Sequence, residues 1–166
     1  MSIAAIKKGG RKQLQTTQNF VDKTLMIKKL IESQAKVTLF TRPRRFGKTL
    51  NQFMIRRFFE DEITEKGEKV DNGYLFDGLK IAECGEEILK HQQQYPVIFL
   101  TLKSAKQPDF EMAYGALADE IYNEFVRHRY VLQSDALLPI EKERYENLLN
   151  RRADEKEVVK AFAFLS

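Results

Sequence analysis

The spacing of apolar residues predicts a chain built largely of helices. From Asp22 onward, apolar residues recur at the interval expected for one face of an amphipathic helix, with Asp22 as a possible N-cap. Gly85 interrupts one of these patterns and predicts a break there. In chain order, the pattern predicts helices over residues 22–33, 48–62, 79–91, 110–132, 139–150 and 154–165.

Two shorter segments predict strands. Residues 36–41 are rich in β-branched and aromatic side chains and stop before Pro43. Residues 97–102 are almost continuously apolar, which is typical of a strand covered on both faces in a parallel sheet. We therefore expect an α/β fold with a parallel sheet flanked by helices.

Composition narrows the class of protein without choosing a function. The 166 residues, 43% of them apolar, suit one globular domain. One cysteine and two histidines exclude a four-ligand Cys/His zinc site and an internal disulfide, so we expect a reducing, cytoplasmic compartment. The apolar run at 97–102 is far shorter than the roughly 18 residues of a membrane span. A net charge of +4 permits a phosphate or nucleic-acid partner but does not require one.

The N-terminal residues differ from the rest of the chain. Residues 1–19 carry two adjacent glycines and four basic residues, with little apolar periodicity. This composition predicts a flexible basic segment before a domain that spans residues 20–166.

The most specific motif joins the first expected strand to the second expected helix. Gly47-Lys48-Thr49 matches the second half of the phosphate-binding Walker A motif. A glycine lets backbone N–H groups approach phosphate oxygens, a lysine reaches the β and γ phosphates, and a threonine hydroxyl holds Mg²⁺. The alternative is an ordinary strand-to-helix turn in which Lys48 is solvated and Thr49 caps the helix.

The first half of the motif departs from the usual pattern. Arg42 stands where the first glycine is expected, and Pro43 removes one backbone N–H donor. Forked hydrogen bonds from Arg42, Arg44 and Arg45 to phosphate oxygens would compensate, and the same arginines would also suit another partner.

No recognisable acid completes a hydrolytic site. P-loop enzymes place an acidic residue at the end of a second apolar strand, where it helps to hold Mg²⁺ and to orient water. No run of four apolar residues here ends in Asp or Glu, and Asp77 lies in a short segment between glycines that predicts a turn. The catalytic residues are therefore unknown, with Asp77 and Asp109 as the first candidates should turnover be found.

Other residues leave alternatives open. Asp22-Lys23-Thr24 lies either near a nucleotide or at a helix cap, and Arg56-Arg57 forms either a basic binding face or a solvated helix face. Packing or surface roles are expected for isolated residues without suitable companions: Cys84, His91 and His128.

Four segments together resemble the bacterial AAA-ATPase-like family. They are Phe20-Val-Asp-Lys-Thr24, Phe40-Thr-Arg-Pro-Arg-Arg-Phe-Gly-Lys-Thr49, Phe76-Asp-Gly-Leu-Lys-Ile81 and Tyr95-Pro-Val-Ile-Phe-Leu100. In that family the loop reads R-P-R-R-F-G-K-[ST], so Arg42 is its usual residue.

The resemblance implies a P-loop NTPase core that binds ATP and Mg²⁺ and is often followed by a restriction-endonuclease-like domain. It places Arg44, Arg45, Phe46, Gly47, Lys48 and Thr49 at the nucleotide, with Thr49 on the metal. The family's acidic strand follows a helix that ends in Phe-Leu-Ser, where this chain stops, so we expect a hydrolysis-deficient N-terminal portion whose sheet lacks that strand. The alternative function is a nucleic-acid or protein interaction module that uses the arginine-rich loop.

Overall fold

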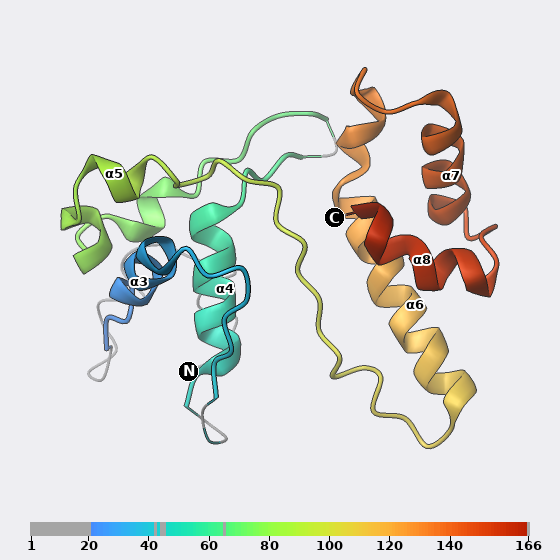
Figure 1. Ribbon diagram of the computed structural model, residues 1–166, viewed down its shortest axis with the longest axis horizontal. Helices are drawn as coiled ribbons and strands as arrows, with labels where there is room; N and C mark the ends of the chain where they lie inside the picture. The colour runs from blue at the N-terminus through green and yellow to red at the C-terminus, as the bar shows by residue number, and fades with distance from the viewer. Residues whose placement is uncertain (1–20, 42, 44–45, 65, 166) are drawn as a thin grey trace. The chain divides into compact units, whose positions relative to one another are not determined.

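The structure is a computed structural model that describes residues 21–41, 43, 46–64 and 66–165 (Figure 1). The chain divides into two compact units. Unit 1 comprises residues 1–62 and 70–97, and unit 2 comprises residues 63–69 and 98–166. Each unit has its own apolar core. The expected flexible segment at 1–19 lies outside the described residues.

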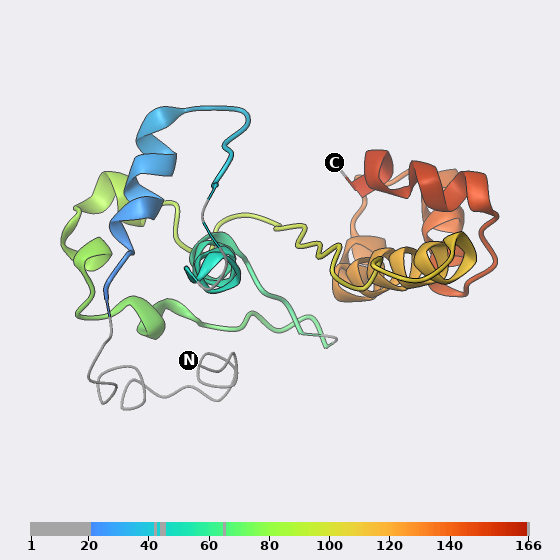
Figure 2. The same ribbon diagram turned by 90° about the horizontal axis from the view of Figure 1, so that it is seen from below.

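Unit 1 is organised around one amphipathic helix, α4 (Lys48–Phe59). Figure 2 views α4 nearly end on and shows α3 (Leu25–Ser33) and the turns of residues 73–91 beside it. Those turns are η1 (Gly73–Phe76), η2 (Lys80–Glu83) and α5 (Glu86–Leu89). Phe58 is fully buried at the centre, with its ring edge-to-face against Phe76 at 5.3 Å between centroids.

The break expected at Gly85 is confirmed. Gly85 has φ of 84° and separates η2 from α5, so the predicted helix over 79–91 consists of two short turns. This left-handed backbone conformation is one that L side chains rarely adopt, which explains why a glycine stands there.

Unit 2 is a helical unit made of α6 (Phe110–Arg127), η3 (Arg129–Gln133), α7 (Pro139–Leu149) and α8 (Glu155–Leu165). Asp109 caps α6 by accepting a hydrogen bond from the Met112 N–H at 2.8 Å. The buried residues of its core are Ile121, Phe125, Tyr145, Leu148 and Ala161. The helices predicted from apolar spacing in this half of the chain are confirmed, with ends shifted by a few residues.

The Glu124 carboxylate ties the extended segment at 97–102 to α6. It is buried, accepts a hydrogen bond from the Phe99 N–H at 3.0 Å, and forms an ion pair with Arg127. His128 is buried beside it, 3.7 Å from the same carboxylate, and contacts Tyr130 at 3.1 Å. His128 therefore packs within unit 2, as expected.

The predicted parallel sheet is wrong for the part of the chain that the structure describes. Residues 36–41 and 97–102 run extended but belong to no strand, and pairing among the described residues is limited to isolated bridges, Glu60 with Tyr95 and Ile63 with Lys69. A strand exists only where a neighbour accepts and donates its backbone hydrogen bonds. Apolar, β-branched composition indicated extended backbone here but could not supply that neighbour.

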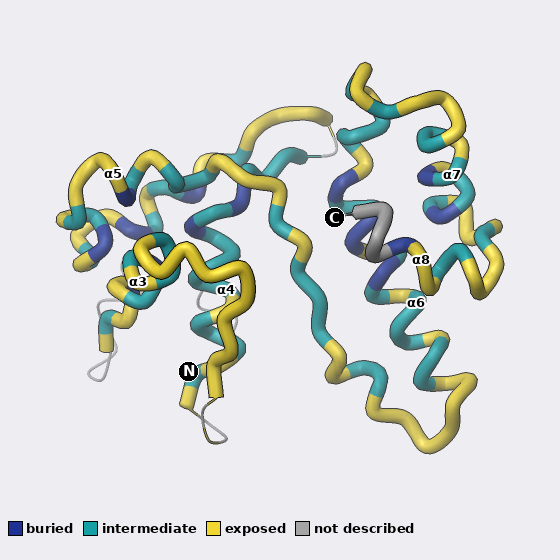
Figure 3. The backbone as a smooth tube through the Cα atoms, viewed as in Figure 1, coloured by how far each residue is buried: buried dark blue, intermediate teal, exposed yellow. Residues whose placement is uncertain are grey.

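Residues 32–41 form a continuous exposed stretch (Figure 3). Val37 is 88% exposed and Leu39 83% exposed, and Leu102 in the second extended segment is also exposed. Among the described residues, no helix is long and apolar enough to cross a bilayer. These segments therefore carry apolar side chains that the rest of their own unit does not cover.

We predict that the purified chain self-associates through these segments, because exposed apolar side chains on extended backbone favour contact between molecules. Replacing both Val37 and Leu39 by lysine should lower the association measured by light scattering. It should change the free energy of unfolding by no more than about 0.5 kcal/mol per site, as is usual at exposed positions. The double variant Gln52→Lys with Ala136→Lys, at two exposed positions outside these segments, adds the same two charges and is the control. A monomeric parent chain would contradict this prediction.

A second prediction concerns Tyr145, whose buried hydroxyl donates to the Phe125 carbonyl at 2.9 Å. Burial is the main cause that raises its pKa far above the usual 10.0. Its neutral form therefore contributes stability below pH 10 that is lost at higher pH, since the unfolded chain ionises first. Tyr145→Phe should cost about 1 kcal/mol at neutral pH and reduce the alkaline loss, as measured by urea unfolding across pH. The exposed Tyr74→Phe is the control.

Candidate functional site

The predicted phosphate-binding loop lies at the first turn of α4. Gly47 precedes the helix with φ of 73° and ψ of 23°, and its carbonyl accepts the Asn51 N–H at 2.9 Å. Lys48 is the first helical residue and is exposed, Thr49 follows and is partly buried, and Phe46 is exposed before the turn. Residues 46–49 therefore place four of the predicted residues directly at a helix N-terminus.

The local geometry at Gly47 suits the close approach of a ligand. A left-handed φ is strained for any residue with a side chain, and no atom of the described residues lies within 4 Å of the place that a Cβ would occupy. The first turn of α4 contains no acidic residue, so the positive end of the helix dipole is not offset locally. Backbone N–H groups at such an end bind phosphate oxygens well.

The structure covers four of the six predicted nucleotide residues. Phe46, Gly47, Lys48 and Thr49 are described and stand next to one another at the start of α4. Arg44 and Arg45 lie outside the described residues, as does Arg42.

Asp22 and Thr24 connect two segments that are far apart in the sequence. Asp22 Oδ1 accepts hydrogen bonds from the N–H and the hydroxyl of Thr24 at 2.8 and 2.7 Å, and its Oδ2 accepts the Lys80 N–H at 2.8 Å. The Thr24 oxygen also accepts the Ile81 N–H at 3.1 Å. Asp22 therefore fastens the start of α3 to η2, and the helix cap is Thr24 rather than Asp22.

The environment of Asp22 favours its charged form. Partial burial is the largest influence and acts to raise the pKa, but the hydrogen bonds from Lys80 and Thr24 and the positive charge of Lys80 outweigh it. The pKa of Asp22 is consequently lower than its ordinary value of 3.8.

Arg56 and Arg57, for which a basic binding face and a solvated helix face were the two alternatives, are both held in ion pairs. Arg56 Nε lies 2.7 Å from a carboxylate oxygen of Glu60, which is only 1% exposed, and Arg57 pairs with Glu62. The Asn72 side chain also donates to Glu62 at 2.7 Å. Both guanidinium groups are thus neutralised within unit 1, and the solvated-face alternative is wrong because the two side chains are largely buried.

The sequence did not single out Glu60 and Glu62, although it contains a usable signal. Arg56 and Glu60 are four residues apart, the spacing of an ion pair on one helix face. That spacing predicts a pair, but it does not predict that the carboxylate is buried, which depends on packing.

Asp77 and Asp109, the two acids considered for catalysis, lie in a turn and at a helix cap. Asp77 follows η1 in a turn with Gly78, which confirms that interpretation, and Asp109 caps α6. Within the described ranges, no group of three or more His, Cys, Asp or Glu side chains is arranged to hold a metal ion.

Comparison with known proteins gave one match. A family model described as predicted AAA-ATPase matches residues 11–160. The searches of curated proteins and of solved structures found no match to the chain.

We predict that Asp22→Asn destabilises the fold by about 1.5–3 kcal/mol, because an amide cannot accept all three hydrogen bonds and carries no charge. The parent should also lose stability as pH falls through the lowered pKa of Asp22, whereas the variant should not show this part of the loss. Chemical unfolding between neutral and acidic pH measures both effects. The exposed Asp135→Asn is the matched control. Equal stability of the parent and Asp22→Asn would contradict the fastening role.

Proposed function

Because the chain belongs to the predicted AAA-ATPase family, we propose that it binds a nucleoside triphosphate, ATP with Mg²⁺, at the loop of residues 44–49. Membership in a family of predicted ATPases supports nucleotide binding in general. The particular loop is proposed from the motif and from its position at the start of α4.

In this proposal each group of the loop has a distinct role. The Lys48 ammonium contacts the β and γ phosphates, the Thr49 hydroxyl binds Mg²⁺, and the N–H groups of residues 46–49 bind phosphate oxygens. Arg44 and Arg45 donate forked hydrogen bonds that stabilise the phosphate charge. Bound Mg²⁺ would supply a positive charge that offsets the triphosphate.

The observation that carries the proposal is the left-handed Gly47 immediately before Lys48 and Thr49. A glycine turn, open space at the missing Cβ and an N-terminal helix dipole are the local features that a phosphate-binding loop needs, and they occur at the motif. They are compatible with a triphosphate and involve no residue of the apolar core.

We propose binding rather than turnover for this chain. The sequence contains no run of four apolar residues that ends in an acid, the position that hydrolytic P-loop proteins use to orient water. The family resemblance further suggests a nuclease-like domain as a partner in longer relatives.

A second candidate function, binding of nucleic acid through the arginine-rich loop, rests on Arg42, Arg44 and Arg45 alone. The ion pairs of Arg56 and Arg57 weaken it, because those guanidinium groups are already engaged by Glu60 and Glu62. Fewer cations are then available to track a phosphate backbone.

We predict that Lys48→Ala lowers the affinity for a fluorescent ATP analogue in Mg²⁺ by at least about tenfold, since a charged contact to phosphate contributes roughly 1.5–3 kcal/mol. The thermal transition should be unchanged, because Lys48 is exposed. Lys106→Ala, an exposed lysine in unit 2, controls for the loss of one positive charge. Equal affinity of the parent and Lys48→Ala would overturn the assignment.

Salt and metal dependence separate the two candidate functions. We predict that binding of the ATP analogue weakens markedly when Mg²⁺ is chelated at constant ionic strength, as a triphosphate site with a hydroxyl metal ligand requires. A single-stranded oligonucleotide should bind weakly or not at all near physiological salt. Tight oligonucleotide binding that falls steeply with added salt and ignores chelation would favour the second candidate.

A further inference from the structure

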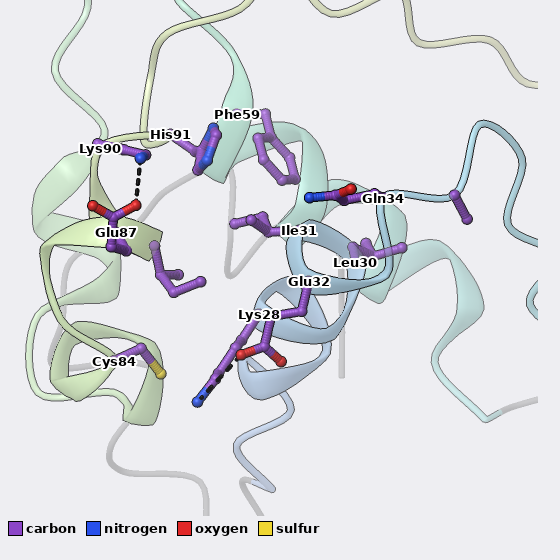
Figure 4. Close-up of a pocket in the computed structure, with 12 residues that line it drawn as sticks. Lys28, Leu30, Ile31, Glu32, Gln34, Phe59, Cys84, Glu87, Lys90 and His91 are labelled. Atoms are coloured by element: carbon purple, nitrogen blue, oxygen red, sulfur yellow. Dashed lines mark hydrogen bonds and ion pairs between the residues drawn. The ribbon is translucent and has the colours of Figure 1, made fainter.

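Unit 1 contains a cavity of about 780 Å³ that the proposed nucleotide site does not use. Its walls come from α3 and the residues after it, from the last residue of α4, and from the turns around α5 (Figure 4). This volume lies within the roughly 300–1,000 Å³ typical of small-molecule sites.

The cavity is remote from the candidate phosphate loop. The two are at opposite ends of α4, since Lys48 begins the helix and Phe59, which lines the cavity, ends it. The eleven steps from residue 48 to residue 59 rise about 16.5 Å at 1.5 Å per residue. The phosphate groups of a nucleotide held at Lys48 therefore do not occupy the cavity.

The charged side chains at the cavity neutralise one another. Lys28 forms an ion pair with Glu32 at 3.6 Å on α3, and Lys90 forms an ion pair with Glu87 on the opposite wall. Each lysine that lines the cavity thus already has a carboxylate partner. This balance favours an uncharged ligand over a phosphate or a carboxylate.

Most of the other residues that line the cavity are apolar or aromatic. Ile88 belongs to the buried core, and Ile31 and Phe59 pack against that core while also facing the cavity. The Phe59 ring is held edge-to-face by Phe58 at 5.2 Å between centroids. A ligand that enters therefore meets a fixed apolar wall rather than mobile chain.

A second ring, His91, forms part of the opposite wall. It stacks on Tyr95 with centroids 5.8 Å apart and an interplanar angle of 17°, and its Nδ1 contacts the Tyr95 hydroxyl. Figure 4 shows His91 and Phe59 at the same end of the cavity, with the Gln34 side chain extending toward Phe59 and Ile31. The Gln34 amide can both donate and accept a hydrogen bond.

We propose that this cavity is a second ligand site, which binds an uncharged planar aromatic molecule carrying a hydrogen-bonding edge. The aromatic and aliphatic walls bury the ring faces, and the Gln34 amide pairs with the polar edge. Because Lys28 pairs with Glu32 and Lys90 pairs with Glu87, the charges of these side chains are already balanced and favour no charged ligand. The proposal is independent of ATP binding at Lys48.

Indole is a suitable probe because the chain contains no tryptophan, so indole emission can be recorded without protein background. We expect titration with the full chain to give a saturable blue shift at one site per chain. The affinity should be unaffected by salt, and Mg²⁺-ATP should not displace the probe. Absence of a saturable shift up to the solubility limit of indole, or affinity that falls with salt, would overturn the proposal.

Cys84 provides a readout inside the cavity, since it lines the wall and is the single cysteine of the chain. Alkylation of its thiol should be slower at saturating indole than without indole, because the bound ring narrows access to the wall that carries Cys84. Alkylation of free glutathione under the same conditions corrects for any direct effect of indole. Unchanged protein alkylation at saturating indole would place the probe elsewhere and overturn the proposal.

A filling variant tests the location without deleting core side chains. Ala35→Phe puts a ring into the cavity from an exposed position and should abolish the indole shift, whereas Ala136→Phe on unit 2 should retain it. A cooperative thermal transition like that of the parent shows that each variant is folded. If Ala35→Phe proves unfolded, Ala35→Leu, which fills less space, should weaken binding in a folded chain. A folded filling variant that binds indole as the parent does would contradict the assigned site.

Discussion

Unit 1 depends on the hydrogen bonds that satisfy the last backbone carbonyls of α4. The last carbonyls of a helix have no partner within it, and here Phe58 accepts the Gln93 N–H at 2.7 Å while Phe59 accepts the N–H groups of Gln94 and Tyr95 at 3.1 and 2.9 Å. The buried Glu60 carboxylate pairs with Arg56 one turn earlier. These contacts join a helix that ends at residue 59 to a segment more than thirty residues later. They also keep Phe58 at the centre of the core, where it contacts the turns of residues 73–91.

The two ends of α4 consequently have different characters. At the C-terminal end, polar groups are buried and paired. Rearranging that end would be costly, because each buried polar group left without its partner destabilises the fold by about 1–3 kcal/mol. At the N-terminal end, Gly47 and Lys48 lie at the surface, where a ligand can reach backbone N–H groups without disturbing the core. Asp22 adds a second fixed point by joining α3 to η2. Contacts at the C-terminal end of α4 and at Asp22 thus hold unit 1 together, whereas Lys48 at the start of α4 is exposed.

Apolar spacing predicted the helices because that signal is local. The stripe of α6, the reciprocal hydrogen bonds between Asp154 and Glu157 at the start of α8, and the break at Gly85 all depend on residues a few positions apart. The predicted sheet failed for the complementary reason. Residues 36–41 and 97–102 have the composition of strands, but pairing requires a partner segment, and in the described residues these segments remain extended and unpaired. Composition determines which backbone conformation a segment prefers, not whether a neighbour is present.

The sequence by itself determined the order of the helices, the position of Gly47-Lys48-Thr49 before a helical pattern, and the family to which the chain belongs. Each of these follows from residues adjacent in the chain or from a linear motif. Only the tertiary structure decided that the Glu60 carboxylate paired with Arg56 is buried, that Asp22 binds the Lys80 backbone fifty-eight residues away, and that a cavity separate from the phosphate loop lies between α3 and α5. Those outcomes depend on which distant groups packing brings within hydrogen-bond distance. Neither the charges nor the apolar periodicity along the chain shows which distant groups will meet.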